Sequence, residues 1–270
     1  MIIDAHTHIG NISQRSGQSV SMTDLLRSMD EAGIDMSLII ADAMDLGDGR
    51  QGLSANDLVK QRGENKRLRV IGNVSINRNL KKQLRELGRM AEAGEIVGIK
   101  LYPGYEDYYP IDKRLWPVYE FCQLNNLAAV FHTGVLMEGT NGVLQQVHPL
   151  KIDEVAVKFP GLCIVMAHLG NPWLLDAAAV ILKNKNVYAD LSGFFAEFET
   201  IKEEDVDRFK QRVKKEFTDF AGNLKKCMFG TDWPLYSQPE YLDAVKALPM
   251  SDEERELVLG GNAMKVYGLE

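Results

Sequence analysis

The feature of this sequence that most constrains its fold is a repeated alternation of short apolar runs with amphipathic segments. An apolar run of about six residues between turn residues is typical of a buried strand, whereas apolar residues at helical spacing predict a helix. The expected strands are centred on Asp4-Ala5-His6-Thr7-His8 and then span residues 36–41, 68–75, 96–102, 127–132, 162–168, 187–191 and 226–230. The first expected helix has Thr23 as its N-cap and ends at Gly33, and the others span residues 53–62, 80–93, 114–124, 152–159, 174–182, 203–220, 239–248 and 252–267.

This pattern predicts an α/β fold, a closed (β/α)8 TIM barrel that forms a single domain over residues 1–270. Strands without polar alternation are buried on both faces, and strands separated by helices run parallel with right-handed crossovers. Eight such units in a chain of this length favour a barrel. The alternative is an open doubly wound sheet, which usually carries a G-x-G-x-x-G turn after its first strand, but here that position holds His6-Thr7-His8-Ile9-Gly10.

The composition of the chain limits the classes of partner that we expect it to bind. A formal net charge of −7 argues against a protein that coats nucleic acid or an anionic membrane, since both contacts need basic surface. The basic run at residues 210–215 lies among acidic residues, which is typical of a solvated helix face. The sequence shows no secretory signal and no apolar run long enough to span a bilayer, and its three scattered cysteines suit reduced thiols. We therefore expect a cytoplasmic protein with a small-molecule substrate, and homo-oligomerisation stays open.

The histidines indicate where the site lies. Four of the five fall on strands or strand ends, and an aspartate follows the eighth strand: His6, His8, His132, His168 and Asp232. The carboxyl ends of all barrel strands open on one face, where active sites form. Five metal-capable side chains on that face predict a divalent metal site. Nitrogen and oxygen ligands without thiolate suit zinc, manganese or iron, and the sequence does not choose among them. Our expectation is Zn2+, with Mn2+ or Fe2+ as alternatives.

Several motifs of the chain resemble the amidohydrolase superfamily of metal-dependent barrels, and more narrowly its amidohydrolase-related branch (amidohydrolase 2). They are the His-x-His pair at His6 and His8 and the segments at residues 98–103, 167–170, 188–193, 230–234 and 261–269. That branch contains hydrolases and decarboxylases of aromatic or muconate-like acids. The motifs span the whole chain and are specific for the branch, but they do not specify a reaction.

The resemblance implies a role for each matching residue. It implies that His6, His8, His132 and Asp232 bind the ion, with Asp232 also accepting a proton from water. It implies that His168 is either a further metal ligand or a general acid/base, so that His168 and Asp232 would be the catalytic pair.

For several other residues the sequence leaves more than one role open. By the resemblance Lys100 could be carboxylated and bridge two metals. The alternative is an unmodified lysine whose ammonium pairs with a substrate carboxylate or with a nearby acid. Asp190 would orient a histidine or cap the next segment, and Asp4 would point into the lower barrel interior, where it needs a partner. Tyrosines after the fourth strand would either wall the substrate pocket or pack the loop: Tyr102, Tyr105, Tyr108 and Tyr109. Trp233, beside Asp232, would help to exclude water, so we expect Lys100, Tyr102 and Trp233 near the substrate.

Three functions fit these observations. The leading hypothesis is a metal-dependent hydrolase in which an ion-activated water attacks a carbonyl-type carbon of a small organic substrate. The alternative keeps the site but makes the enzyme a carbon–carbon lyase, a non-oxidative decarboxylase of an aromatic or muconate-like carboxylic acid. A third hypothesis is a non-catalytic barrel that only binds a metabolite or partner.

Overall fold

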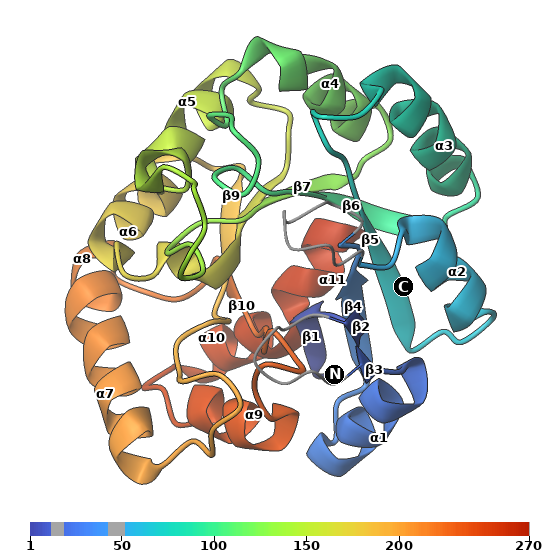
Figure 1. Cartoon of the computed structure of the whole chain (residues 1–270). Helices are drawn as coiled ribbons and strands as arrows, with labels where there is room; N and C mark the ends of the chain where they lie inside the picture. The colour runs from blue at the N-terminus through green and yellow to red at the C-terminus, as the bar shows by residue number, and fades with distance from the viewer. Residues whose placement is uncertain (12–18, 43–51, 270) are drawn as a thin grey trace.

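A computed structural model of the chain describes residues 1–11, 19–42 and 52–269, and these residues form a nearly closed eight-stranded parallel barrel (Figure 1). Its strands, in sheet order, are β1 (Ile3–Thr7), β4 (Met36–Ile40), β5 (Leu68–Asn73), β6 (Ile96–Leu101), β7 (Ala128–Phe131), β8 (Ile164–Met166), β9 (Val187–Asp190) and β10 (Cys227–Met228). A separate short hairpin pairs β2 (Gly10–Asn11) with β3 (Ser19–Val20). The barrel confirms the fold expected from the sequence.

The barrel closes between β10 and β1 through the chain that follows β10. Ala5 N donates to Phe229 O at 2.9 Å, Asp232 N to His6 O at 2.8 Å and His8 N to Trp233 O at 2.7 Å. The seam therefore joins the segment with His6 and His8 directly to the segment with Asp232.

Helices connect successive strands and form the outer layer. They are α1 (Met22–Ala32), α2 (Ala55–Arg62), α3 (Leu80–Glu92), α4 (Trp116–Leu124), α5 (Leu150–Lys158), α6 (Leu174–Lys183), α7 (Glu203–Val213), α8 (Asp219–Ala221), α9 (Gln238–Lys246), α10 (Asp252–Glu256) and α11 (Asn262–Tyr267). Short 3-10 turns span Lys113–Leu115, Leu144–Gln146 and Ala167–Gly170, and π-helical turns at Lys214–Thr218 and Leu257–Gly261 interrupt the two longest expected helices. None of the described helices is long and apolar enough to cross a membrane.

The start of α1 differs from the expectation that Thr23 is the N-cap. Ser21 caps the helix instead, because its hydroxyl accepts from Asp24 N at 3.2 Å while the Asp24 carboxylate accepts from Ser21 N at 2.9 Å. This reciprocal capping box starts the helix two residues earlier.

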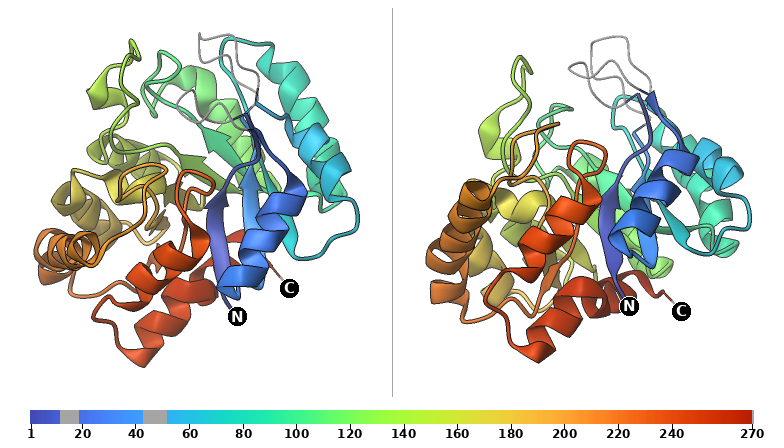
Figure 2. Two further views of the ribbon diagram at one scale, coloured as in Figure 1. Left: turned by 60° about the horizontal axis from the view of Figure 1, so that its bottom comes forward. Right: turned by 90° about the horizontal axis from the view of Figure 1, so that it is seen from below.

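Helix α11 closes the barrel end opposite the site. Ala263, Val266 and Tyr267 pack against interior strand residues such as Val165 and Met228. Figure 2 shows this red C-terminal helix beneath the strands, at the end where the chain begins. The opposite end of the barrel, where the strands finish, is therefore the face available to a ligand.

A register irregularity in β1 corrects the expected direction of Asp4. Asp4 pairs with Ser37 and Thr7 pairs with Ile39, so the β1–β4 register shifts between Asp4 and Thr7. The Asp4 carboxylate accepts from Gln238 Nε2 on the outer helix α9 at 2.8 Å, and from Thr231 N at 3.0 Å and Thr231 Oγ1 at 2.6 Å. Because a bulge breaks simple alternation, Asp4 faces the helix layer and not the lower barrel interior.

Candidate metal centre and active site

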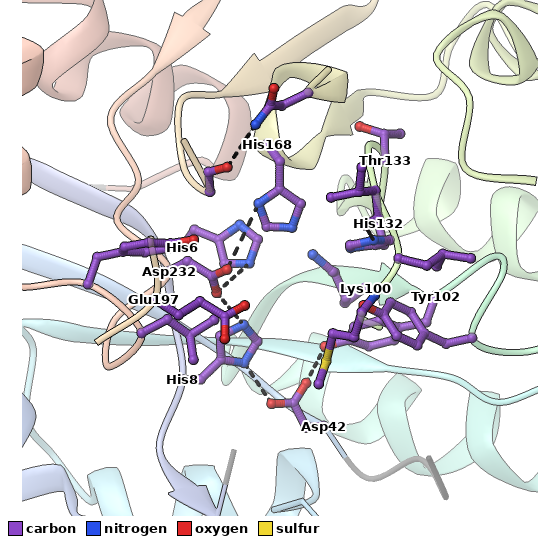
Figure 3. Close-up of a pocket in the computed structure, with 18 of the residues that line it drawn as sticks. His6, His8, Asp42, Lys100, Tyr102, His132, Thr133, His168, Glu197 and Asp232 are labelled. Atoms are coloured by element: carbon purple, nitrogen blue, oxygen red, sulfur yellow. Dashed lines mark hydrogen bonds and ion pairs between the residues drawn. The ribbon is translucent and has the colours of Figure 1, made fainter. Parts of the chain in front are cut away.

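The carboxyl ends of the strands surround a cavity of about 290 Å³ (Figure 3). His6 lies on β1 and His8 just after it, His132 follows β7, His168 follows β8 and Asp232 follows β10. All five line this cavity. The barrel topology thus brings together the side chains that sequence reasoning placed at the strand ends.

Three of these side chains converge on one point. His8 Nε2 lies 3.3 Å and His6 Nε2 lies 3.6 Å from Asp232 Oδ1, and the donor atoms of all three residues lie within 4.8 Å of one another. Ligands at about 2.0–2.2 Å from a tetrahedral ion are about 3.4 Å apart. The spacing of His6, His8 and Asp232 therefore fits a divalent ion between them.

Two carboxylates hold the rings of this histidine pair. Asp190 Oδ2 lies 2.9 Å from His6 Nδ1, and Asp42 Oδ2 lies 2.7 Å from His8 Nδ1. Asp190 accepts the Nδ1 proton of His6, and Asp42 forms a close ion pair with His8 at Nδ1, so the lone pair of each ring in its neutral form sits on Nε2 and faces Asp232. A carboxylate–histidine pair of this kind orients metal-binding histidines in proteins. Tyr102 donates its hydroxyl hydrogen to Asp42 and fixes that carboxylate in turn.

Asp190 thus orients a histidine, the first of the two roles expected for it. Burial alone would raise the pKa of Asp190, but the adjacent His6 ring holds it well below its usual range. The pKa of Asp232 is likewise low, because His6, His8 and His168 outweigh the effect of burial. Both carboxylates are therefore ionised and can balance the charge of a cation.

His168 and Asp232 both have backbone conformations that non-glycine residues rarely adopt. Their φ angles are +60° and +64°, in the left-handed region, and such strain is concentrated at functional sites. Asp190 Oδ1 accepts from His168 N at 3.0 Å and so holds this turn. A Cβ at Gly193 would lie 2.8 Å from His168 Nδ1, so the loop after β9 needs glycine there.

A serine that the sequence did not single out fixes the His168 ring. Ser192 Oγ donates to Asp190 Oδ1 and lies 2.8 Å from His168 Nδ1. Because the serine proton is already donated, the ring donates from Nδ1 and keeps its lone pair on Nε2. Burial lowers the pKa of His168 to about 3, so the ring is neutral in the metal-free protein.

His132 stands beside the converging group without joining it. Its Nε2 lies 3.1 Å from Val135 O, and its ring centroid is 5.0 Å from that of His168. Among the described residues, the two groups with metal-binding spacing are His6–His8–Asp232 and His6–His168–Asp190. A ligand role for His132 or His168 remains a prediction that needs a metal-bound structure.

The residues expected near the substrate divide into two sets. Lys100 and Tyr102 line the cavity with Tyr105, and the Lys100 ammonium lies 5.3 Å from the centroid of the Tyr102 ring. Trp233 does not line the cavity, because the left-handed turn at Asp232 directs the next side chain into the core under the helices. Tyr108 and Tyr109 also lie outside the cavity lining.

The electrostatics of His8 predict a pH dependence of metal binding. Burial alone would lower the pKa of His8, but Asp42 and Asp232 raise it to about 10. In the metal-free protein a proton on Nε2 thus occupies the position that fits an ion. Because the pKa is raised in the folded state, this pairing stabilises the metal-free protein fully below a pH of about 6.5 and is lost as the pH rises through about 10.

An ion must displace this proton, so we expect its affinity to rise up to about tenfold per pH unit between about pH 6 and 8. Titration calorimetry in buffers of different ionisation enthalpy measures the proton release. Binding without proton release would contradict the assignment of His8.

Comparisons with known proteins show which family model and which solved structures the chain resembles. A family model described as Amidohydrolase matches residues 3–269. No curated protein sequence matches the chain. A solved structure of an uncharacterized TIM-barrel protein from Bordetella bronchiseptica superposes with a TM-score of 0.76 at 20% identity, covering 99% of this chain and 98% of that one.

Two further solved structures carry metals. An amidohydrolase from Burkholderia multivorans with bound zinc has a TM-score of 0.74 at 18% identity and covers 100% of both chains. A dihydroxybenzoic acid decarboxylase from Polaromonas sp. JS666, with bound manganese and the inhibitor 2-nitroresorcinol, has a TM-score of 0.71 at 17% identity, covering 99% of this chain and 97% of that one. At these identities the likeness shows the shared barrel fold.

Proposed function

The chain belongs to the amidohydrolase family, and from this membership and the geometry of its site we propose that it is a metal-dependent hydrolase of a small organic substrate. The observation that carries the proposal is the convergence of His6 Nε2 and His8 Nε2 on Asp232 Oδ1, at 3.6 and 3.3 Å, at the cavity. We propose Zn2+ as the ion and the cytoplasm as the location.

The residues present suit hydrolysis. A divalent ion held by His6, His8 and Asp232 would polarise a carbonyl oxygen and lower the pKa of water. Asp232 Oδ2 lies 4.0 Å from His168 Nδ1, so a proton taken from the attacking water by Asp232 stays next to a neutral histidine. His168 would accept that proton at Nε2, which carries the ring lone pair, and pass it to the leaving group. The Lys100 ammonium would stabilise negative charge on the carbonyl oxygen.

Metal removal tests this proposal. Dialysis against a chelator should abolish turnover, and adding back Zn2+ or Mn2+ should restore it, because the ion supplies the activation that the side chains lack. The assay is a panel of lactones, esters and amides, with incorporation of oxygen from labelled water into the product. Undiminished activity in protein shown by elemental analysis to be metal-free would refute metal dependence.

Decarboxylation of an aromatic or muconate-like acid is the second candidate. The observation that favours it is the buried ammonium of Lys100 beside the Tyr102 ring, which would suit a flat molecule with a carboxylate. Here the ion and Lys100 would bind the carboxylate, and His168 would handle the proton that replaces it on carbon. Release of labelled carbon dioxide from carboxyl-labelled aromatic acids, without incorporation of solvent oxygen, would distinguish this reaction from hydrolysis.

A further inference from the structure

Two oppositely charged side chains that line the cavity have no polar partner among the described residues. Lys100 is 1% exposed, yet its ammonium makes no hydrogen bond or ion pair with them. Glu197, in the loop between β9 and α7, is half-buried, and its carboxylate also makes none. Two other acidic groups next to the proposed metal site already have partners, because Asp42 pairs with His8 and Asp232 faces the histidines.

The two side chains have different surroundings. Figure 3 shows Lys100 on the side of His132 and Tyr102, and Glu197 on the side of His8 and Asp232. The charge of Glu197 raises the pKa values of both Tyr105 and Tyr236, although burial is the larger cause. Glu197 therefore acts on the cavity wall and is not simply a solvated surface group.

Burial without a hydrogen-bond partner disfavours the charged form of Lys100 and lowers its pKa, so an acceptor that enters the cavity would stabilise the ammonium. Lys100 as an ammonium can only donate hydrogen bonds, so its partner must be an acceptor such as an oxygen atom. Glu197 in its ionised form can only accept hydrogen bonds, so its partner must be a hydrogen-bond donor or a cation. A ligand that satisfies both must have an acceptor at one end and a donor at the other.

From this pair of charges, which have no polar partner in the part of the chain that the structure describes, and resting on the proposed function, we propose that the substrate is a dipolar molecule. Its acyl oxygen, a carbonyl or carboxyl next to the ion, is held by Lys100, and an N–H or O–H donor group at its other end is held by Glu197. Glu197 is thus a specificity-determining residue that favours amine-, amide- or hydroxyl-bearing substrates and repels a second carboxylate at that position.

Matched probes test this assignment on the zinc-loaded protein. Para-aminomethylbenzamide and para-carboxybenzamide share the amide oxygen for Lys100 and differ only in the charge offered to Glu197. Calorimetry should show the aminomethyl compound binding at least about tenfold more tightly than the carboxy compound, the effect expected of one charge-assisted hydrogen bond.

Variants separate the two side chains. In Glu197→Gln this preference should fall about tenfold, whereas Glu199→Gln, an exposed position in the same loop, should keep it. Lys100→Met should weaken both probes alike, and electron density in a crystal structure should show an unmodified lysine at position 100. An unchanged preference in Glu197→Gln, or a carboxylated Lys100, would overturn the proposal.

Zinc binding and turnover are measured separately on the same samples. A protein that binds zinc and hydrolyses a panel substrate but shows no charge preference refutes only the dipolar substrate. A protein that shows the preference without metal-dependent turnover refutes only the proposed function.

Discussion

Replacing Asp232 with asparagine is expected to lower kcat/KM by at least about 1000-fold, corresponding to the several kcal/mol that a bound ion contributes to catalysis. Asp232 Oδ1 is the atom on which His6 Nε2 and His8 Nε2 converge, and its carboxylate is ionised. The amide has nearly the same shape but no charge for the ion and no capacity to accept a proton from water. Zinc content and turnover should therefore fall together.

The matched control for this variant is Asp243→Asn. Asp243 is an exposed aspartate on α9, so the same chemical change there should leave zinc content and turnover unchanged. Circular dichroism of both variants checks that the barrel is folded. Full activity in Asp232→Asn would exclude the proposed role of this residue.

Replacing Asp42 with asparagine should weaken zinc binding about 10–100-fold, the usual effect of losing a carboxylate that orients a metal-binding histidine. Asp42 Oδ2 lies 2.7 Å from His8 Nδ1, and the second oxygen accepts from Tyr102. An asparagine can donate from Nδ2 to the Tyr102 hydroxyl oxygen and keep its Oδ1 next to His8 Nδ1, so the packing is retained. The lost negative charge makes the His8 lone pair a weaker ligand.

Tyr102→Phe is the control for this prediction. It removes the hydrogen bond to Asp42 but keeps the carboxylate next to His8, so zinc affinity should change less than about threefold. Competition with a chromophoric chelator gives both affinities. Equal zinc affinity in Asp42→Asn and the unsubstituted protein would show that Asp42 has no role in the metal site.

The barrel was predictable from the sequence because its strands are short apolar runs separated by helices. That signal is local, and it places His6, His8, His168 and Asp232 on one face without knowledge of any side-chain contact. The same reasoning failed for Asp4, since a bulge within β1 changes the direction of its side chain. A bulge depends on how two strands pair, which one strand's sequence does not specify.

Three residues at or beside the cavity were missed for a related reason. Asp42 follows β4 at the same face as the histidines, so the rule used for Asp232, which selects polar side chains just after a strand, could have found it. Ser192 and Glu197 lie in the loop after β9, where side-chain direction depends on the path of the loop. The left-handed turn at Asp232, which sends Trp233 into the core, is equally invisible in the sequence pattern.

The most direct test of the metal centre is a crystal structure of the zinc-loaded protein with anomalous scattering measured at the zinc edge. We expect an anomalous peak about 2.0–2.2 Å from His6 Nε2, His8 Nε2 and an Asp232 carboxylate oxygen, with Asp190 and Asp42 still on the two Nδ1 atoms. A zinc ion held elsewhere, with His8 Nε2 still paired directly to Asp232, would contradict the proposed site.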